Sequence, residues 1–438
     1  MKRHYYCLIA VLSLFPFFQY LPASAQGSAE QVITLTTSRA IGDSVRIKVV
    51  SQNAAPVSVE GLSESTLAQD YKKYQIKSQT IVLRGPVLFL ATFSNGITQI
   101  VFKNANVLDR IDCEQNELTD LDFTEAPNLR QLFCHKNKLE RINVEACTQL
   151  QWFNCSENRL KSLNVSNNAS LNILVCADNK LNALDTKRLT SLQTLDCARN
   201  MLNTLDLTAN HSLRGLACQN NLLTDLRLTG CERLETIVAS ANKLTQLDLS
   251  GLSKLKDLRC YENAIERLSF AESPLVKTIY LECNFIKERD MTDLMRSLPI
   301  AEENAKKGAK IGVLDLTYSK EKNVCNKEAV GIATKKHWSV LAFDGRKYIP
   351  YEGSGSASLE EVPDNNDKPL VYPTEVTDRL YLSQAFSKSG FPPLIYSLEG
   401  REILRLKDGE VSSVDVSELP QGMYIVVSGS LSASFIKR

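Results

Sequence analysis

Residues 129–139 read LRQLFCHKNKL, and the leucine, cysteine and asparagine positions of this stretch return at one constant interval along the middle of the chain. The cysteines of the pattern are Cys113, Cys134, Cys155, Cys176, Cys197, Cys218 and Cys260, and Ala239 takes the one slot without cysteine. An asparagine follows each slot at a fixed offset: Asn95, Asn116, Asn137, Asn158, Asn179, Asn200, Asn221, Asn242, Asn263 and Asn284. A fixed period over so many units predicts a solenoid.

Each position of the pattern has a physical reason. The alternation of leucine with exposed residues up to the cysteine predicts a short strand, and a unit this small must stack on its neighbours to bury its apolar side. An asparagine side chain carries donors and an acceptor, so a column of them can satisfy backbone groups where the chain turns. The return segment, for example 118–123, is too short for a full helix, which predicts extended or 3₁₀ structure there.

The pattern resembles the leucine-rich repeats, and in particular the cysteine-ladder repeats of bacterial surface proteins of the internalin J group. This resemblance covers residues 87–286 and implies a right-handed, mainly β solenoid. We expect a small N-terminal β cap over 26–85, the solenoid over 86–286 and an α/β C-terminal cap over 287–350. A linker rich in Gly, Ser, Asp and Pro is predicted for 351–368, and a separate β-sandwich for 369–438.

The N-terminus indicates export. Residues 1–25 combine Lys2 and Arg3, an apolar run and the sequence Ala23-Ser24-Ala25, which is typical of a secretory signal peptide. No second stretch is apolar enough to predict a transmembrane segment. The formal net charge of +1, with no basic stripe, gives no reason to expect a nucleic-acid partner.

The segment 369–438 resembles a type IX secretion sorting domain. The motif positions are Pro373, Val376, Gly400, Gly422 and Tyr424, and Thr374-Glu375 stands where that family usually has Asn-Pro. The resemblance implies recognition by the type IX secretion machinery, export through the outer membrane and removal of this domain near the linker. It also implies cell-surface attachment or secretion of the mature protein.

Twelve cysteines in an exported chain raise the question of disulfides. Side chains at equivalent positions of adjacent rungs keep their Cβ atoms about 4.8 Å apart, whereas a disulfide needs about 3.8 Å. We therefore interpret the ladder cysteines as small buried apolar residues rather than disulfides or metal ligands. Cys147 and Cys231 lie four rungs apart and cannot pair, and the sequence leaves open whether Cys283 and Cys325 do.

No constellation of catalytic residues stands out. The chain has four histidines, and none lies in a catalytic or metal-binding motif. Cys134 and His135 are neighbours, but adjacent strand residues point to opposite faces. We therefore predict a non-enzymatic protein without a metal or cofactor.

The residues that alternate with the buried leucines should project from the concave face of the sheet. Four of them, Phe133, Trp152, Ile173 and Val175, are predicted to form one exposed apolar patch, with Tyr261 and Tyr280 as a weaker second site. Arg110 and Asp257 are expected to lie outside the patch. The alternative is that these are scattered surface residues of the ordinary kind.

A patch of this kind indicates an adhesin-like surface or secreted protein. Its ligand would be a protein or glycan on a host or neighbouring cell. The alternative function is structural, with self-association in a surface or biofilm matrix. A ligand-binding protein should stay monomeric, whereas an assembly protein should oligomerise.

Overall fold

The computed structural model describes residues 30–302, 308–319, 321–354, 371–372, 375–376, 379–382, 393–397, 402–405, 413–428 and 431–437. The chain divides into two compact units, Met1–Ser356 and Ala357–Arg438. The predicted signal peptide, all of the predicted linker after Ser354, and the motif residues Pro373 and Gly400 lie outside the described residues. In the described part, no helix has the length and apolar character needed to cross a bilayer.

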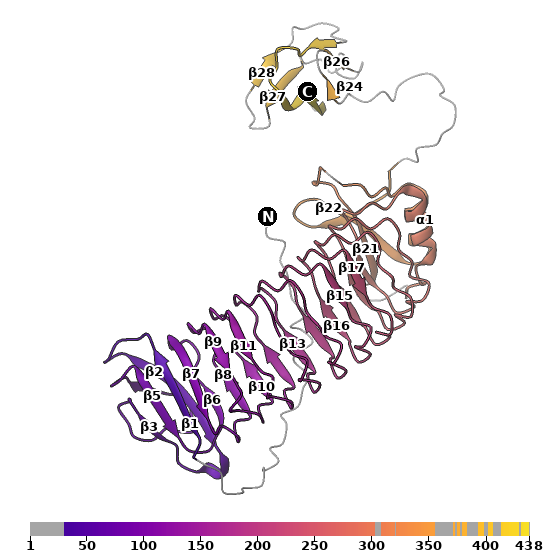
Figure 1. Ribbon diagram of the computed structural model, residues 1–438. Coiled ribbons are helices and arrows are strands. Elements are labelled where there is room, and N and C mark those ends of the chain that lie inside the picture. The colour runs from indigo at the N-terminus through magenta and orange to yellow at the C-terminus, as the bar shows by residue number, and fades with distance from the viewer. Residues whose placement is uncertain are drawn as a thin grey trace. The chain divides into compact units, whose positions relative to one another are not determined.

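One long sheet runs through the first unit, and its repeat strands follow one another as parallel rungs (Figure 1). These strands are β6 (Val87–Ala91), β8 (Arg110–Asp112), β10 (Gln131–Phe133), β12 (Trp152–Asn154), β13 (Ile173–Val175), β14 (Thr194–Asp196), β16 (Gly215–Ala217), β18 (Thr236–Val238), β19 (Asp257–Arg259) and β20 (Thr278–Tyr280). Residues one repeat apart pair directly, as Gln131 does with Trp152. The chain is thus a mainly β leucine-rich-repeat solenoid, which confirms the fold predicted from the period.

The return side of the coil is extended, one of the two conformations that the sequence allowed. Four short strands form two parallel pairs there: β9 (Asp120–Asp122) with β11 (Arg141–Asn143), and β15 (Thr204–Asp206) with β17 (Asp225–Arg227). A turn follows, in which an acidic side chain accepts a backbone N–H two residues on, at 2.9 Å from Thr124 to Asp122 Oδ1. Hydrogen bonds from Thr124 lower the pKa of the Asp122 carboxyl.

The ladder cysteines fill the interior between the two sides. All seven are 0% exposed and carry free thiols. Burial raises the pKa of each of them, for Cys155 to about 12, because a thiolate would be poorly solvated among the leucines. Cys283 and Cys325 are also buried, and the structure does not join them in a disulfide.

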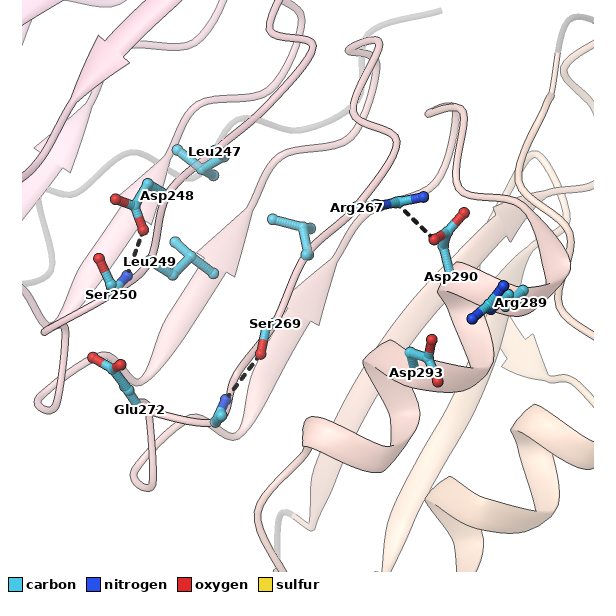
Figure 2. A pocket seen from close by; sticks show the side chains of 12 residues that line it. Leu247, Asp248, Leu249, Ser250, Arg267, Ser269, Glu272, Arg289, Asp290 and Asp293 are labelled. Carbon is cyan, nitrogen blue, oxygen red and sulfur yellow. Dashed lines mark hydrogen bonds and ion pairs between the residues drawn. The ribbon is translucent and has the colours of Figure 1, made fainter.

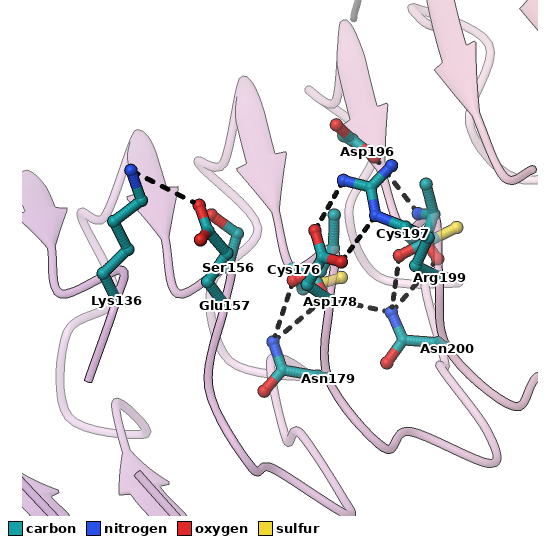
Figure 3. A network of polar contacts seen from close by, with 12 residues as sticks. Lys136, Ser156, Glu157, Cys176, Asp178, Asn179, Asp196, Cys197, Arg199 and Asn200 are labelled. Carbon is teal, nitrogen blue, oxygen red and sulfur yellow. Dashed lines mark hydrogen bonds and ion pairs between the residues drawn. The ribbon is translucent and has the colours of Figure 1, made fainter. Parts of the chain in front are cut away.

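The asparagines form a second, polar ladder at one corner of the coil. The side-chain amide of Asn200 donates to the carbonyl oxygens of Cys176 and Cys197, at 3.0 and 3.1 Å (Figure 3). Its Oδ1 accepts the backbone N–H of Leu181 at 3.0 Å. Each asparagine therefore ties its own rung to the preceding one and satisfies buried backbone groups that the turn leaves unpaired.

The residue before each asparagine adopts a left-handed backbone conformation, with φ between 53° and 57°. None of these residues is glycine: they are Ser94, Gln115, Lys136, Glu157, Asp178, Arg199, Asn220, Ala241, Glu262 and Cys283. Figure 3 shows four of these side chains along the same corner of the coil, where Lys136 pairs with Glu157 at 3.7 Å and Arg199 pairs with Asp178. The asparagine ladder holds the backbone in a conformation that most L-residues avoid.

An antiparallel cap covers the first rung. It contains β1 (Val32–Thr37), β2 (Ser44–Ser51), a 3₁₀ turn over Gln52–Ala54, β3 (Ser58–Glu60), β4 (Lys72–Gln75), β5 (Thr80–Arg84) and β7 (Ile97–Lys103). Strands β2 and β4 continue the long sheet beyond β6, whereas β3, β5, β1 and β7 form a second sheet. The long sheet, and with it the concave face, therefore extends into the cap.

The other end is closed by an α/β cap, as predicted. It contains α1 (Glu288–Ser297), β21 (Ala309–Asp315), α2 (Lys327–Lys335), β22 (Trp338–Phe343) and β23 (Tyr348–Pro350). Asn323 continues the asparagine ladder out of period, because its Oδ1 accepts the N–H of Ile286 at 3.0 Å. The Glu321 carboxylate accepts the N–H groups of Cys283 and Asp315, both at 2.8 Å, where the next rung would have supplied carbonyls.

The second unit consists of two sheets around a small core. One contains β24 (Val371–Tyr372), β26 (Arg379–Leu382) and β29 (Ser413–Asp415), and the other contains β25 (Glu375–Val376), β31 (Leu431–Lys437), β30 (Gly422–Ser428), β27 (Leu394–Ser397) and β28 (Glu402–Arg405). Both sheets contribute to the core, for example Leu380 and Val426. Of the predicted sorting residues, Val376 lies in β25, Gly422 begins β30, and Tyr424 donates to Pro420 O at 2.8 Å.

Candidate ligand-binding face of the solenoid

The concave face carries three in-register columns of side chains, because the rungs pair residue for residue. The first column includes Arg110 and Trp152, and the second includes Phe133 and Val175. The third column lies just after the cysteine slot and includes Glu114. Neighbours within a column are about 4.8 Å apart, so side chains of successive rungs touch.

A row of three aromatic rings and one guanidinium occupies the N-terminal part of this face. Arg110 Cζ lies 5.0 Å from the ring centroid of Phe89 and 4.9 Å from that of Phe133. The Phe133 and Trp152 rings meet edge to face, with centroids 5.1 Å apart. We call these four residues the aromatic ladder; cation–π and edge-to-face contacts hold its members in place.

The predicted role of Arg110 was wrong, because its side chain lies within the patch rather than outside it. Its Nε and Nη2 donate to the two carboxylate oxygens of Asp112, at 2.9 and 2.8 Å. Asp112 is only 7% exposed, so the guanidinium is oriented from below while the two rings hold it from the sides. The ladder is thus arranged before any ligand arrives.

Two other predicted patch residues differ in their exposure. Ile173 is 4% exposed, so its prediction as an exposed contact was wrong. It lies between Trp152 and Thr194 in its column, and the large Trp152 ring on the preceding rung can cover a β-branched side chain one strand spacing away. Val175 is partly exposed and remains at the surface.

The second predicted site, Tyr261 and Tyr280, is not an open surface. Tyr261 is buried, with 9% of its surface exposed. The Tyr280 ring lies 4.6 Å from the Tyr348 ring of the cap, between centroids. It also packs so closely on the next strand that a Cβ at Gly312 would come within 2.8 Å of it. These rings join the last rungs to the cap.

Aromatic residues outside the prediction extend the open patch. Tyr71 is 46% exposed and meets Phe93 edge to face, with centroids 5.6 Å apart. Lys48 Nζ lies 5.4 Å from the Tyr71 ring centroid. The repeat phase places Phe89 and Phe93 on the concave side, but Tyr71 precedes β4 and carries no periodic signal.

Two titratable side chains flank the ladder in the third column. Desolvation by burial raises the pKa of the Glu114 carboxyl, and burial lowers the pKa of His135. Cys134 and His135 form no catalytic pair, since the Cys134 thiol is directed to the Asn154 carbonyl oxygen at 3.5 Å. In the described part of the chain, no group of three His, Cys, Asp or Glu side chains could hold a metal ion.

A hollow of about 520 Å³ lies between the return side of the last rungs and α1 (Figure 2). Several of its polar groups bond within the protein. Arg267 pairs with Asp290 at 2.8 Å, Asp248 accepts the N–H of Ser250 at 2.9 Å, and Glu272 accepts that of Gly251 at 2.6 Å. The concave face is the better candidate because the rings of its aromatic ladder are partly exposed and are held in place by contacts between successive rungs.

No protein-family model matches the chain, and no curated protein matches it either. Several solved structures are similar in fold. The internalin InlF from Listeria monocytogenes is 19% identical, with a TM-score of 0.44 over 59% of this chain and 83% of that chain. The functional domain of InlJ from Listeria monocytogenes, which includes a cysteine ladder, is 19% identical, with a TM-score of 0.30 over 80% of this chain and 90% of that chain.

The chain spans only 36% of another similar structure, the TLR13–ssRNA13 complex, which is 18% identical with a TM-score of 0.39 over 59% of this chain. At these identities the likeness concerns the fold alone. The fold itself is the leucine-rich-repeat solenoid formed by this chain's own strands, cysteines and asparagines.

Proposed function

We propose that this protein is an exported binding protein that recognises a protein ligand through the aromatic ladder on its concave face. The observation that carries the proposal is the ladder itself: Phe89, Arg110, Phe133 and Trp152 on successive rungs, oriented by Asp112. Aromatic and arginine side chains held rigidly at a surface are the usual composition of binding hot spots. Packing within the solenoid gives no reason for large side chains at these outward positions.

A protein ligand fits the ladder better than a glycan does. A sugar ring stacks on an open aromatic face, whereas the Phe133 ring is already contacted by Arg110 and by Trp152. A protein ligand can instead insert an apolar or aromatic side chain beside the ladder. Several rings that are fixed in advance lose little conformational entropy when a ligand binds.

The test is a screen of the protein against host-protein and glycan arrays, followed by affinity measurements on the ligand found. Trp152→Ala should weaken binding by about 2 kcal/mol, roughly 30-fold, because a central ring is lost. Leu222→Ala is the matched control: this apolar side chain is 43% exposed but lies outside the concave face. Equal affinity of the Trp152 variant and the wild type would contradict the proposal, and self-association of the wild type would favour the matrix role.

The route of export is part of the same proposal. The N-terminal signal peptide would direct the chain across the inner membrane, and the type IX secretion machinery would recognise residues 369–438. Support comes from the sequence motifs and from the separate fold of this unit, which has its own core. Deleting 372–438 should leave the solenoid folded but retain it in the periplasm. Normal surface exposure of the truncated protein on cell fractionation would contradict the sorting role.

A further inference from the structure

The concave face does not end at the first rung. Strand β2 pairs with β6, with Lys48 opposite Ala91, and directly opposite residues of an antiparallel pair project to the same face. Ala91 shares its column with Asp112 and Phe133. The side chains of Lys48 and, two residues earlier, Arg46 therefore belong to the concave face, beside the aromatic ladder.

Arg46 and Lys73 stand directly opposite each other in the β2–β4 pair. Like charges in this arrangement repel and destabilise the pair of strands. Both side chains are exposed, and neither has a carboxylate partner among the residues the structure describes. The nearest lysine on β4, Lys72, differs in this respect because it pairs with Glu64 at 2.8 Å.

These two cations line a recess of about 180 Å³ together with a third, Arg39. Arg39 donates to the backbone carbonyl oxygens of Ser44 and Ser94, at 2.8 and 2.7 Å, so its guanidinium is fixed but its charge is not neutralised. Phe93 forms part of the wall, and no described residue of the lining is acidic.

The backbone beneath the recess is held rigidly. Asn95, the first asparagine of the ladder, accepts the N–H of Arg46 at 2.8 Å and donates to its carbonyl oxygen at 2.7 Å. The asparagine ladder therefore fixes the strand from which Arg46 projects, and the Arg39 guanidinium is held by its two carbonyl contacts. A group of cations without counter-charges favours an anionic partner.

We propose that this recess is a subsite for a carboxylate of the ligand, so that the recognised segment carries an acidic residue next to the apolar side chain bound at the ladder. This inference rests on the proposed function for the identity of the ligand as a protein. It adds how the bound segment is oriented: its acidic residue lies over the N-terminal cap, and its apolar side chain lies at the aromatic ladder. A carboxylate at Arg46 and Lys73 also removes the repulsion between the two side chains.

The experiment uses the full chain and a fluorescein-labelled hexaglutamate peptide, with binding followed by fluorescence anisotropy at low salt, where charge interactions are strongest. The double variant Arg46→Gln/Lys73→Gln should weaken binding at least tenfold. Lys180→Gln/Lys243→Gln removes the same charge from two exposed lysines elsewhere and should leave binding within twofold. Arg46→Lys keeps the positive charge, so this variant should retain most of the affinity for hexaglutamate.

Three outcomes would overturn the inference: no binding of hexaglutamate by the wild type, equal loss in the two double variants, or equal binding of hexalysine. A heparin tetrasaccharide is the third probe. If it binds through Arg46 and Lys73 while hexaglutamate does not, the subsite takes sulfated glycans instead. Hexaglutamate has no ring, so its binding should survive Trp152→Ala, and failure of this inference is thereby distinguished from failure of the ladder's role.

Discussion

Aromatic residues occupy outward strand positions at both ends of the concave face, but their surroundings differ. At the N-terminal end Phe133 and Trp152 contact each other and Arg110, all from the rungs themselves. At the C-terminal end Tyr280 contacts Tyr348, which belongs to the cap. The same position in the repeat therefore gives contacts among the rungs alone at one end and a joint to the cap at the other, depending on whether a cap strand folds over it.

The largest expected effect is a difference in stability between variants at the two ends of the concave face. Tyr280→Ala should lower the free energy of unfolding by about 2 to 3 kcal/mol, because the ring packs against Tyr348, Arg259 and the backbone at Gly312. Trp152→Ala should lower it by less than about 1 kcal/mol. Chemical denaturation measures both, and similar losses in the two variants would break the distinction.

A second experiment asks whether the asparagine ladder contributes equally to stability near the two ends of the concave face. Asn158 and Asn263 each donate to two carbonyl oxygens at 3.0 Å and accept one N–H. Changing either to alanine should cost about 2 kcal/mol, since buried backbone groups lose their partners. Exposed Lys180→Ala should change stability by less than about 0.5 kcal/mol. A much smaller loss at one asparagine would show that the ladder is not uniform.

A third experiment tests whether Arg110 holds the rings of the aromatic ladder, at the N-terminal end of the concave face, in place. Arg110→Lys keeps the charge but loses the bidentate contact with Asp112 and the planar stacking between Phe89 and Phe133. We expect a loss of about 1 kcal/mol in ligand affinity with the fold unchanged. Arg259→Lys, the equivalent change beside Tyr280, should leave affinity unaltered. Loss of affinity in both variants would mean that ligand contacts reach the C-terminal end.

The smallest effect is a pH dependence at the open end. Burial lowers the pKa of His135, so below the unfolded value of about 6.5 the unfolded chain binds more protons than the folded one. The charge of nearby Lys136 also lowers the pKa of His135, whereas the charges of Glu157 and Asp112 raise it. Stability should therefore fall as the pH drops below about 6.5, and His135→Asn should remove this part of the slope. An unchanged slope in the variant would contradict the assignment.

The period alone was sufficient to predict the strands, the buried cysteines and the asparagine positions, because each repeats the same contact on every rung. Contacts made by residues outside the repeat pattern were not predictable. Asn323 and Glu321 of the C-terminal cap bond the backbone N–H groups at the end of the asparagine ladder, at spacings unrelated to the repeat period. The left-handed residue before each asparagine was also missed, since glycine, the usual signal, is absent from those slots.

The candidate site was predicted in part. Strand phase placed Phe133 and Trp152 on the concave face, but phase does not indicate which neighbours shield a side chain. Ile173 is covered within its column, and Tyr261 is buried near the cap. The inclusion of Arg110 depends on rings on both adjacent rungs, which only the in-register pairing reveals.

The in-register stacking of the rungs also fixes the distance between the two ends of the solenoid in units of one strand spacing. Because equivalent residues of successive repeats pair directly, deletion of one whole repeat between Val175 and Asp257 would leave the flanking strands, the cysteine ladder and the asparagine ladder in phase. Such a change would bring the open end and the capped end closer by one strand spacing, about 4.8 Å. The distance between the two ends can therefore change only in steps of that size, and a ligand long enough to touch both would detect each step as a change of fit.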